Sequence, residues 1–139
     1  MIIESELIQL SIDKVVQTKA YTIAILGNNE KRFGIYLDPQ VGKVMQLYLT
    51  NTERQRPYTH DLMESCFQGF GIEVQQVVIM SIQDTIYYAR LFLEQKIGDF
   101  RHIVEVDCRP SDSLTLALIK DVPIFCTKEV FEESIAVED

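Results

Sequence analysis

Two short polar blocks hold most of the residues whose types and spacing could do chemistry. They are RPYTHDLME at 56–64 and EVDCRPSD at 105–112. In each block an arginine, Arg56 or Arg109, precedes a proline just ahead of a predicted helix. Because the residue before proline is pushed toward extended backbone, each arginine should lie beside the free N–H groups of that helix. Such a site can bind an oxyanion, and we assign Arg56, Arg109 and Ser111 to phosphate binding.

Acidic residues and a histidine in the same blocks could supply acid–base or metal chemistry. His60 and Glu64 are four residues apart, which places them on one helix face at the border of its apolar stripe. Such a pair could act as acid and base or bind a divalent cation. Asp107 at a strand end and Asp112 in the next helix turn could converge on Mg²⁺ or Mn²⁺. The candidate catalytic residues are His60, Asp61, Glu64, Asp107 and Asp112, and the candidate metal ligands are Asp107 and Asp112.

The same residues also have a purely structural interpretation, and the sequence leaves both open. Asp61 and Asp112 fall in the first turns of their helices, where a carboxylate favours the helix dipole without any ligand. Arg56 or Arg109 could pair with these aspartates. The blocks would then mark two helix starts with structural ion pairs.

The elements that must position these blocks alternate hairpins with helices. Alternating apolar residues predict strands, and apolar residues at steps of three and four predict helices. Strands are predicted at 5–17, 20–26, 32–37, 72–82, 85–95, 100–108 and 122–126, and helices at 38–49, 59–69, 109–120 and 127–135. The order β-β-β-α-α-β-β-β-α-β-α predicts an α/β protein of the α+β type, with a mixed sheet and helices packed on it. Residues 1–128 form the predicted single domain, and 129–139 form an acidic C-terminal helix or tail.

Length and charge narrow the classes of function. The chain has 139 residues, which is enough for one domain and one core. Its formal net charge of −8 argues against tight, nonspecific binding to duplex nucleic acid. Residues 129–139 hold five of the acids and no base, so part of that charge belongs to the C-terminal end. Local phosphate contacts by arginine elsewhere in the chain remain compatible with this balance.

The cysteines and the missing motifs exclude several other classes. Three widely spaced cysteines outside any Cys-x-x-Cys pair fit a reduced, cytoplasmic protein. We expect no targeting segment and no membrane span, since no apolar run approaches the roughly 18 residues that a span needs. There is no Walker loop, dinucleotide fingerprint, nucleophile elbow or zinc motif. We therefore expect no organic cofactor.

The two blocks resemble the pattern of the bifunctional nuclease family. RPYTHDL at 56–62, GIEV at 71–74, YARL at 88–91 and DCRPSDSLTLAL at 107–118 match that pattern in order. The similarity is strong over 56–126 and weaker over about 5–55. DPQVGK at 38–43 departs from it, because family members usually carry an acidic residue and alanines there. The resemblance implies a mixed α/β fold, commonly as a homodimer, and nuclease activity on DNA and RNA.

Two functions follow as hypotheses. The first is a nuclease dependent on Mg²⁺ or Mn²⁺, in which Asp107 and Asp112 hold the cation, His60 is acid or base, and Arg56 and Arg109 bind phosphate oxygens. The second is a non-enzymatic binding or regulatory module that uses the same arginines for a small anion or an acidic peptide. The net charge and the absence of any basic run or tryptophan favour the second hypothesis.

Overall fold

The computed structural model describes residues 7–138, which form one mixed sheet and four helices. The strands are β1 (Leu7–Gln17), β2 (Thr22–Gly27), β3 (Arg32–Leu37), β4 (Ile72–Gln83), β5 (Ile86–Ile97), β6 (Phe100–Cys108) and β7 (Ile124–Thr127), and the helices are α1 (Pro39–Leu49), α2 (Thr59–Gly69), α3 (Pro110–Lys120) and α4 (Lys128–Glu133). The predicted fold class and element order are confirmed. Positions 1–6 and 139, which include the ends of the predicted first strand, domain and tail, lie outside the described residues.

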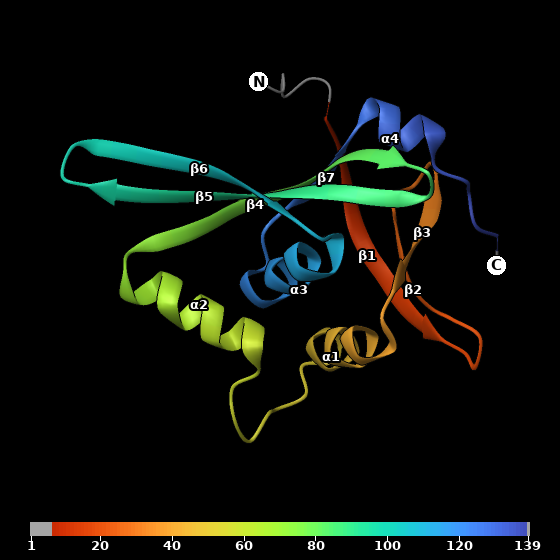
Figure 1. Ribbon diagram of the computed structural model, residues 1–139, viewed down its shortest axis with the longest axis horizontal. Coiled ribbons are helices and arrows are strands. Elements are labelled where there is room, and N and C mark those ends of the chain that lie inside the picture. Colours follow the sequence, from red (N-terminus) through yellow and green to blue (C-terminus); the bar gives the residue numbers. More distant parts are fainter. Residues whose placement is uncertain (1–6, 139) are drawn as a thin grey trace.

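The sheet joins two antiparallel groups of strands through one short strand. Its order is β3-β2-β1-β7-β4-β5-β6, and every pairing is antiparallel except that of β4 with β7. In Figure 1 the β1–β3 group crosses the long β4–β6 meander steeply, as strong sheet twist produces. β7 therefore connects the two groups, and the three consecutive strands predicted at 72–82, 85–95 and 100–108 form an antiparallel meander.

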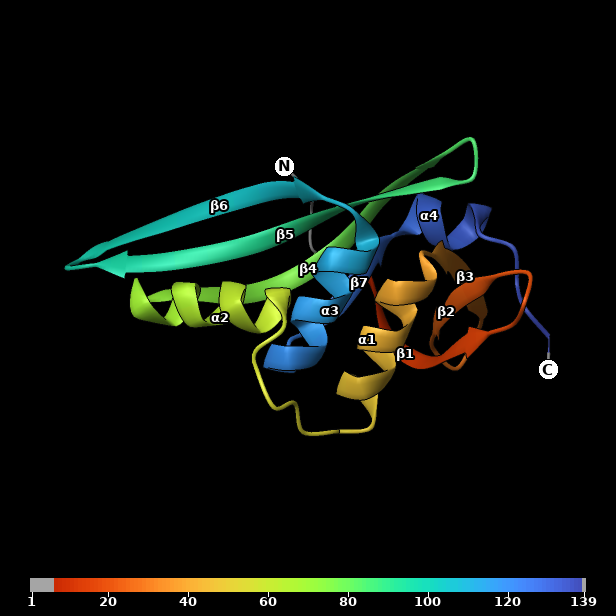
Figure 2. The same cartoon turned by 60° about the horizontal axis from the view of Figure 1, so that its bottom comes forward.

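Three helices cover one face of this sheet, and α4 packs on the other side (Figures 1 and 2). Helix α3 lies between α1 and α2, and its residues Leu114, Leu116 and Ala117 are at most 2% exposed. The apolar sequence on all sides of α3 predicts this burial. α3 is thus the central helix of the core, and its N-terminus is fixed by packing along the whole helix.

The predicted helix starts are confirmed by their caps. Asp38 accepts a hydrogen bond from the Gln40 N–H at 2.8 Å at the start of α1, and Thr127 accepts one from the Val130 N–H at 3.2 Å at the start of α4. Helix α4 ends at Glu133, two residues before the predicted end. It stops because the chain extends from Ser134 and Ala136 bridges to β3.

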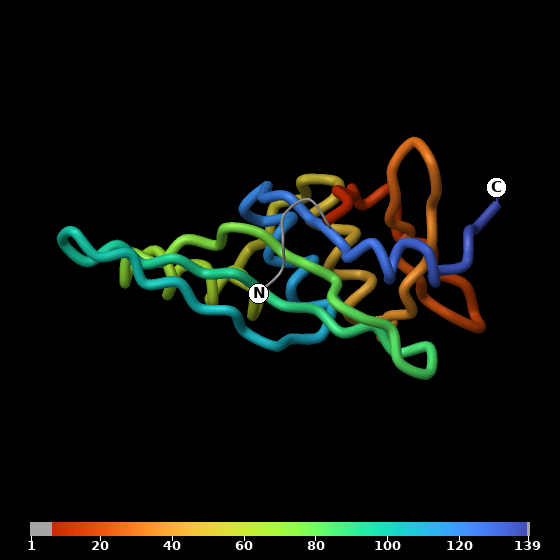
Figure 3. Tube along the Cα trace, turned by 90° about the horizontal axis from the view of Figure 1, so that it is seen from above, coloured from red at the N-terminus to blue at the C-terminus, as the bar shows by residue number. Residues whose placement is uncertain are grey.

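The edge strand β6 is the least buried strand of the sheet. None of its nine residues is buried, and Phe100 and Ile103 are 79% and 56% exposed. Seen from above in Figure 3, the hairpin of β5 and β6 extends away from the rest of the domain. Alternation along 100–108 predicts a strand but does not show that it lies at an open edge.

No helix within residues 7–138 has the length and hydropathy needed to cross a membrane.

Candidate active site

The two polar blocks meet at the N-termini of α2 and α3. His60 in the first turn of α2 lies 2.9 Å from Asp112 in the first turn of α3, measured from Nε2 to Oδ1. In Figure 2 the two helices lie side by side. Because α3 is held in the core and α2 packs on it, this contact joins two segments that are 52 residues apart in sequence. The structure thus brings together the histidine and one of the predicted carboxylates.

The contact with Asp112 orients the His60 ring. A carboxylate oxygen accepts hydrogen bonds, so Nε2–H is the donor here, and the neutral tautomer that fits this contact has Nδ1 as its proton acceptor. The side chain is 13% exposed and lines a cavity of about 440 Å³ between α1 and residues 57–60. A carboxylate that orients an imidazole in this way is the usual arrangement of a general base.

Asp112 also holds Arg109. The Nε and Nη2 atoms of Arg109 donate to Asp112 Oδ2 at 3.3 and 3.2 Å, while the arginine side chain stays 73% exposed. Arg109 has the extended backbone predicted for a residue before proline, with φ −72° and ψ 144°. Ser111 in the next turn is 8% exposed, and both residues line a cavity of about 370 Å³. The phosphate-binding candidates Arg109 and Ser111 are therefore adjacent to the His60–Asp112 pair.

Asp61 is enclosed by the protein itself. Its two carboxylate oxygens accept hydrogen bonds from Arg54 Nε and Nη2, both at 2.8 Å, and Oδ2 also accepts one from the Tyr58 N–H at 2.8 Å. The Arg54 guanidinium holds the pKa of Asp61 below its ordinary value. Both oxygens are occupied by internal partners, so the contacts of Asp61 are those of a residue that fixes the start of α2.

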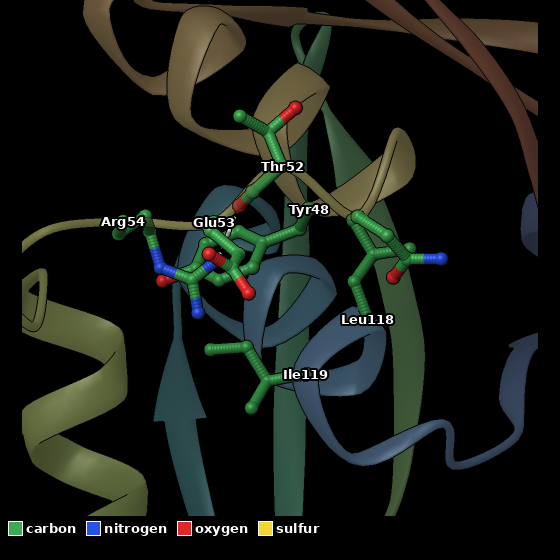
Figure 4. A pocket seen from close by; sticks show the side chains of 7 residues that line it. Tyr48, Thr52, Glu53, Arg54, Leu118 and Ile119 are labelled. Carbon is green, nitrogen blue, oxygen red and sulfur yellow. Dashed lines mark hydrogen bonds between the residues drawn. The ribbon is translucent and has the colours of Figure 1, made fainter.

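Arg54 is in turn placed by Tyr48, at the end of α1. The guanidinium carbon lies 4.3 Å from the centre of the Tyr48 ring, and Nη1 donates to the Thr52 carbonyl at 3.0 Å. Burial, followed by contact with the Asp61 carboxylate, raises the pKa of Tyr48 to about 12. Figure 4 shows Tyr48 and Arg54 beside Ile119 in a cavity of about 430 Å³. This cluster ties the loop before α2 to α1.

Glu64 lies on the face of α2 that it shares with His60, but it binds the other end of α3. Its Oε2 accepts hydrogen bonds from Lys120 Nζ at 2.9 Å and from Gln68 Nε2 at 3.3 Å, and the residue is 7% exposed. The Glu64 carboxylate raises the pKa of Lys120. His60 and Glu64 therefore dock one face of α2 onto α3 at two points, and Glu64 is not joined to the His60–Asp112 pair.

The side chains of Arg56 and Asp107 are exposed and make no hydrogen bond or ion pair with any residue in 7–138. Asp107 is the penultimate residue of β6 and follows two residues after Glu105, which pairs with Arg90 at 3.0 Å. Burial raises the pKa of the Cys108 thiol, and the charges of Asp112 and Asp107 add to that rise.

Within the part of the chain that the structure describes, no group of three His, Cys, Asp or Glu side chains is placed to hold a metal ion. Mg²⁺ commonly uses only one or two protein carboxylates and completes its shell with water and substrate phosphate. Carboxylates at Asp107 and Asp112 have the donor chemistry that such a hydrated ion takes. By donor chemistry alone, the two carboxylates suit a hydrated ion and not one held by protein groups only.

Several residues of this region carry no signal that sequence patterns detect. Arg54 reaches Asp61 across the turn that precedes α2, and Lys120 reaches Glu64 from a helix 56 residues further along. In the sequence pattern, Tyr48 cannot be told apart from the other apolar residues of α1. Only the polar stretch that contains Arg54, lying between two helical patterns, points to this cluster.

Comparison with known proteins finds similar chains in bacteria and plants. An uncharacterized protein of Mycobacterium tuberculosis is 28% identical over 107 residues, which are 77% of this chain and 61% of that protein. Bifunctional nuclease 2 of Arabidopsis thaliana is 32% identical over 80 residues, which are 58% of this chain and 24% of the plant protein. Bifunctional nuclease 2 of japonica rice is 33% identical over 76 residues, 55% of this chain and 23% of the plant protein.

The chain thus matches less than two thirds of the length of these relatives. The family model of the bifunctional nuclease domain matches residues 24–139, which include α1, both polar blocks and the whole β4–β6 meander. This chain belongs to the bifunctional nuclease domain family.

Proposed function

We propose that the protein hydrolyses phosphodiester bonds of DNA, RNA or both at the junction of α2 and α3. The observation that supports this most is the 2.9 Å contact between His60 and Asp112, which turns two separate sequence blocks into one site. Arg109 on the same carboxylate adds an exposed cation. A proton acceptor, its orienting carboxylate and a phosphate-binding cation are the parts that such a reaction uses.

In this proposal each residue has one role. His60 Nδ1 takes a proton from the water that attacks phosphorus, while Asp112 keeps the imidazole in the tautomer that makes Nδ1 free. Arg109 and Ser111 bind the non-bridging phosphate oxygens. Arg56, which is exposed just before α2, contacts a neighbouring phosphate of the nucleic acid.

A divalent cation is part of the same proposal. Asp107 and Asp112 would hold Mg²⁺ or Mn²⁺ together with water, and the ion would polarise the phosphate and lower the pKa of a bound water. Binding has a readout apart from activity: each ion should raise the melting temperature of the wild-type protein. Asp107→Asn should reduce this shift, and an unchanged shift in that variant would remove Asp107 from the site.

The experiment that tests the function compares cleavage of plasmid DNA and of RNA, with Mg²⁺ and with Mn²⁺, by wild type and the double variant Asp107→Ala, Asp112→Ala. Asp99→Asn is the matched control, because Asp99 lies in the exposed turn between β5 and β6. We expect cleavage by wild type and by the control, and loss of cleavage in the double variant. Equal cleavage by all three proteins would show a contaminating nuclease and contradict the proposal.

A module that binds a phosphate-bearing ligand without cleaving it is the second candidate. The net charge of −8 favours it, because most proteins that grip nucleic acid are basic. The same phosphate site at Arg109 would serve, but substrate would be bound and not turned over. Binding of oligonucleotides with no cleavage under any metal condition would favour this candidate over the nuclease.

We further propose that the protein forms a homodimer through β6. This strand ends the sheet, so the backbone groups on its outer side have no strand partner within residues 7–138. It exposes Phe100, Ile103, Val104 and Val106, with 37–79% of their surface accessible. An open edge with apolar side chains is a surface that proteins normally cover, and two antiparallel copies of one strand can pair about a twofold axis.

Light scattering after size exclusion tests the dimer. Ile103→Lys should convert a dimer of about 32 kDa, twice the 16.0 kDa chain, into monomer. Ile135→Lys is the control, since Ile135 is 84% exposed and lies outside the sheet edge. A wild-type protein that runs as a monomer at all concentrations, or an unaffected Ile103→Lys variant, would contradict this interface.

A further inference from the structure

A cavity beside Arg109 combines a phosphate-binding wall with an aromatic wall. It measures about 370 Å³ and lies between the start of α3, the end of β3 and the turn that opens β5. Its lining includes Arg109 and Ser111 at the start of α3, Tyr36 of β3 and Tyr87 of β5. The Asp38 carboxylate, which caps α1, also lines it. The cavity is therefore large enough for one nucleotide and has chemically distinct ends.

The polar end offers a donor that the fold does not use. Ser111 is 8% exposed, and its hydroxyl makes no hydrogen bond to any residue in 7–138. The hydroxyl is open to the cavity, so it can donate to a bound oxygen acceptor without breaking a hydrogen bond of the fold. Arg109 stands next to it with most of its guanidinium in solvent. Both groups donate hydrogen bonds, so this end is suited to an anion.

The aromatic end has one open ring and one that is already covered. Tyr87 stacks on Phe33, with centroids 5.9 Å apart and planes at 14°, so its face is used inside the protein. Tyr36 is 70% exposed. Tyr21 packs against it edge to face, at 6.0 Å and 86°, which fixes the orientation of the ring and leaves its surface accessible. Tyr36 is therefore a supported, open stacking surface.

We propose that this cavity binds one nucleotide of a single-stranded nucleic acid, with its base on Tyr36 and an adjoining phosphate on Arg109 and Ser111. The inference rests on the proposed function, because it assigns the class of substrate to the same site. A base has a free face only when it is unstacked, as in a single strand, so the Tyr36 surface selects against duplex. A net charge of −8 also argues against the long basic surface by which proteins bind duplex nucleic acid.

Binding is measured without cleavage, in EDTA and at low ionic strength, with a 12-nucleotide probe that carries 2-aminopurine. The protein contains no tryptophan, so the fluorescence of this base is read without interference. Wild type should bind the single strand at least about tenfold more tightly than the same sequence in a duplex, and stacking should change the probe's fluorescence. Inorganic phosphate and a mononucleotide serve as competitors, and the mononucleotide should compete better because it brings a base.

Variants at Tyr36 assign the stacking surface. Tyr36→Ala should weaken single-strand binding about tenfold and abolish the stacking signal, whereas Tyr36→Phe should retain both. Tyr88→Ala is the matched control, because Tyr88 is also exposed, at 39%, but alternation directs it to the opposite face of β5 from Tyr87. Tyr36→Leu replaces the alanine variant if the latter unfolds, as judged by circular dichroism.

The outcome separates this inference from the nuclease proposal. Selective single-strand binding that depends on Tyr36, without cleavage in Mg²⁺ or Mn²⁺, would support the inference and reject the nuclease. Cleavage together with equal binding of single strand and duplex, or with unchanged binding in Tyr36→Ala, would overturn the inference and leave the nuclease standing.

Discussion

Asp61 and Asp112 occupy the same third position of helices α2 and α3, yet they have opposite surroundings. Asp61 is closed in by Arg54 and by the Tyr58 N–H, all three hydrogen bonds measuring 2.8 Å. Asp112 keeps 32% of its side chain exposed and bridges His60 of the other helix to Arg109. One aspartate completes its own helix start, whereas the other joins two elements at a surface with a cavity on either side.

The difference arises because the two arginines stand at different positions relative to the helix that each one contacts. Arg54 approaches Asp61 from outside the helix, stacked on Tyr48, and presents Nε and Nη2 to both oxygens. Arg109 is the N-cap residue itself, so it reaches only one oxygen and remains in solvent. The other oxygen of Asp112 is then available to a histidine. A shared sequence signal thus gives a carboxylate that completes its own helix start at α2 and one that joins two helices at α3.

The largest expected effect is on turnover. His60→Ala removes the imidazole that we propose as the general base, and it should reduce cleavage by about 10²–10⁴-fold. The free energy of unfolding should fall much less, because the contact with Asp112 is one partly exposed hydrogen bond. Initial rates on RNA and on denatured DNA measure the first quantity, and urea unfolding measures the second. His102→Ala, on the exposed strand β6, is the control and should cleave normally.

The next largest effect should be on the free energy of unfolding, with little change in the rate of cleavage. Asp61→Asn removes charge-assisted bonds to Arg54 and should lower the free energy of unfolding by about 2 kcal/mol. Under conditions where the variant is fully folded, its cleavage rate should stay near that of wild type. A variant that is as stable as wild type but inactive would reverse the roles assigned to the two aspartates.

The same variant predicts a dependence on pH. The pKa of Asp61 is held below its ordinary value of 3.8 in the folded protein. The ion pair with Arg54 therefore contributes its full stabilisation of the fold at pH values well above 3.8. The stability gap between wild type and Asp61→Asn should therefore be constant from neutral pH down to about 5 and should close as pH falls further below 3.8. Urea unfolding at several pH values measures it, and a gap that persists unchanged in acid would contradict the pair.

The smallest effect on stability should come from the exposed arginine of the other helix. Arg109→Ala removes an ion pair with an arginine that is 73% exposed, so the free energy of unfolding should change by at most about 0.5 kcal/mol. Oligonucleotide binding should nevertheless weaken, because a phosphate contact is lost. Thermal unfolding and fluorescence anisotropy measure the two effects on one sample. A large loss of stability would show that Arg109 is structural, as Arg54 is.

Sequence patterns predict the frame of this site well because its causes are local. Alternation and caps such as Asp38 and Thr127 depend on residues within a few positions of each other, and the apolar body of α3 marks it as central. The resemblance between the two Arg-Pro blocks and the family pattern also identifies the two segments that the structure brings into contact.

The partner of each carboxylate is not local, and the sequence does not reveal it. The pairing of Asp112 with His60, and of Asp61 with Arg54, depends on how α2 packs on α3 and how the loop before α2 turns back toward α1. Spacing along one helix favours His60 with Glu64 instead, although Glu64 binds Lys120. The choice between two equivalent aspartates is therefore a tertiary property.

The most direct test compares kcat/KM of wild type, Asp112→Asn and Asp61→Asn on one single-stranded fluorogenic oligonucleotide, at a temperature where all three are folded. The asparagine at 112 can donate to the His60 ring and favour the wrong tautomer, so we expect kcat/KM to fall about a hundredfold or more, with Asp61→Asn close to wild type. If Asp112→Asn cleaves as fast as wild type, or if both variants lose activity equally, the junction of α2 and α3 is not the reactive centre.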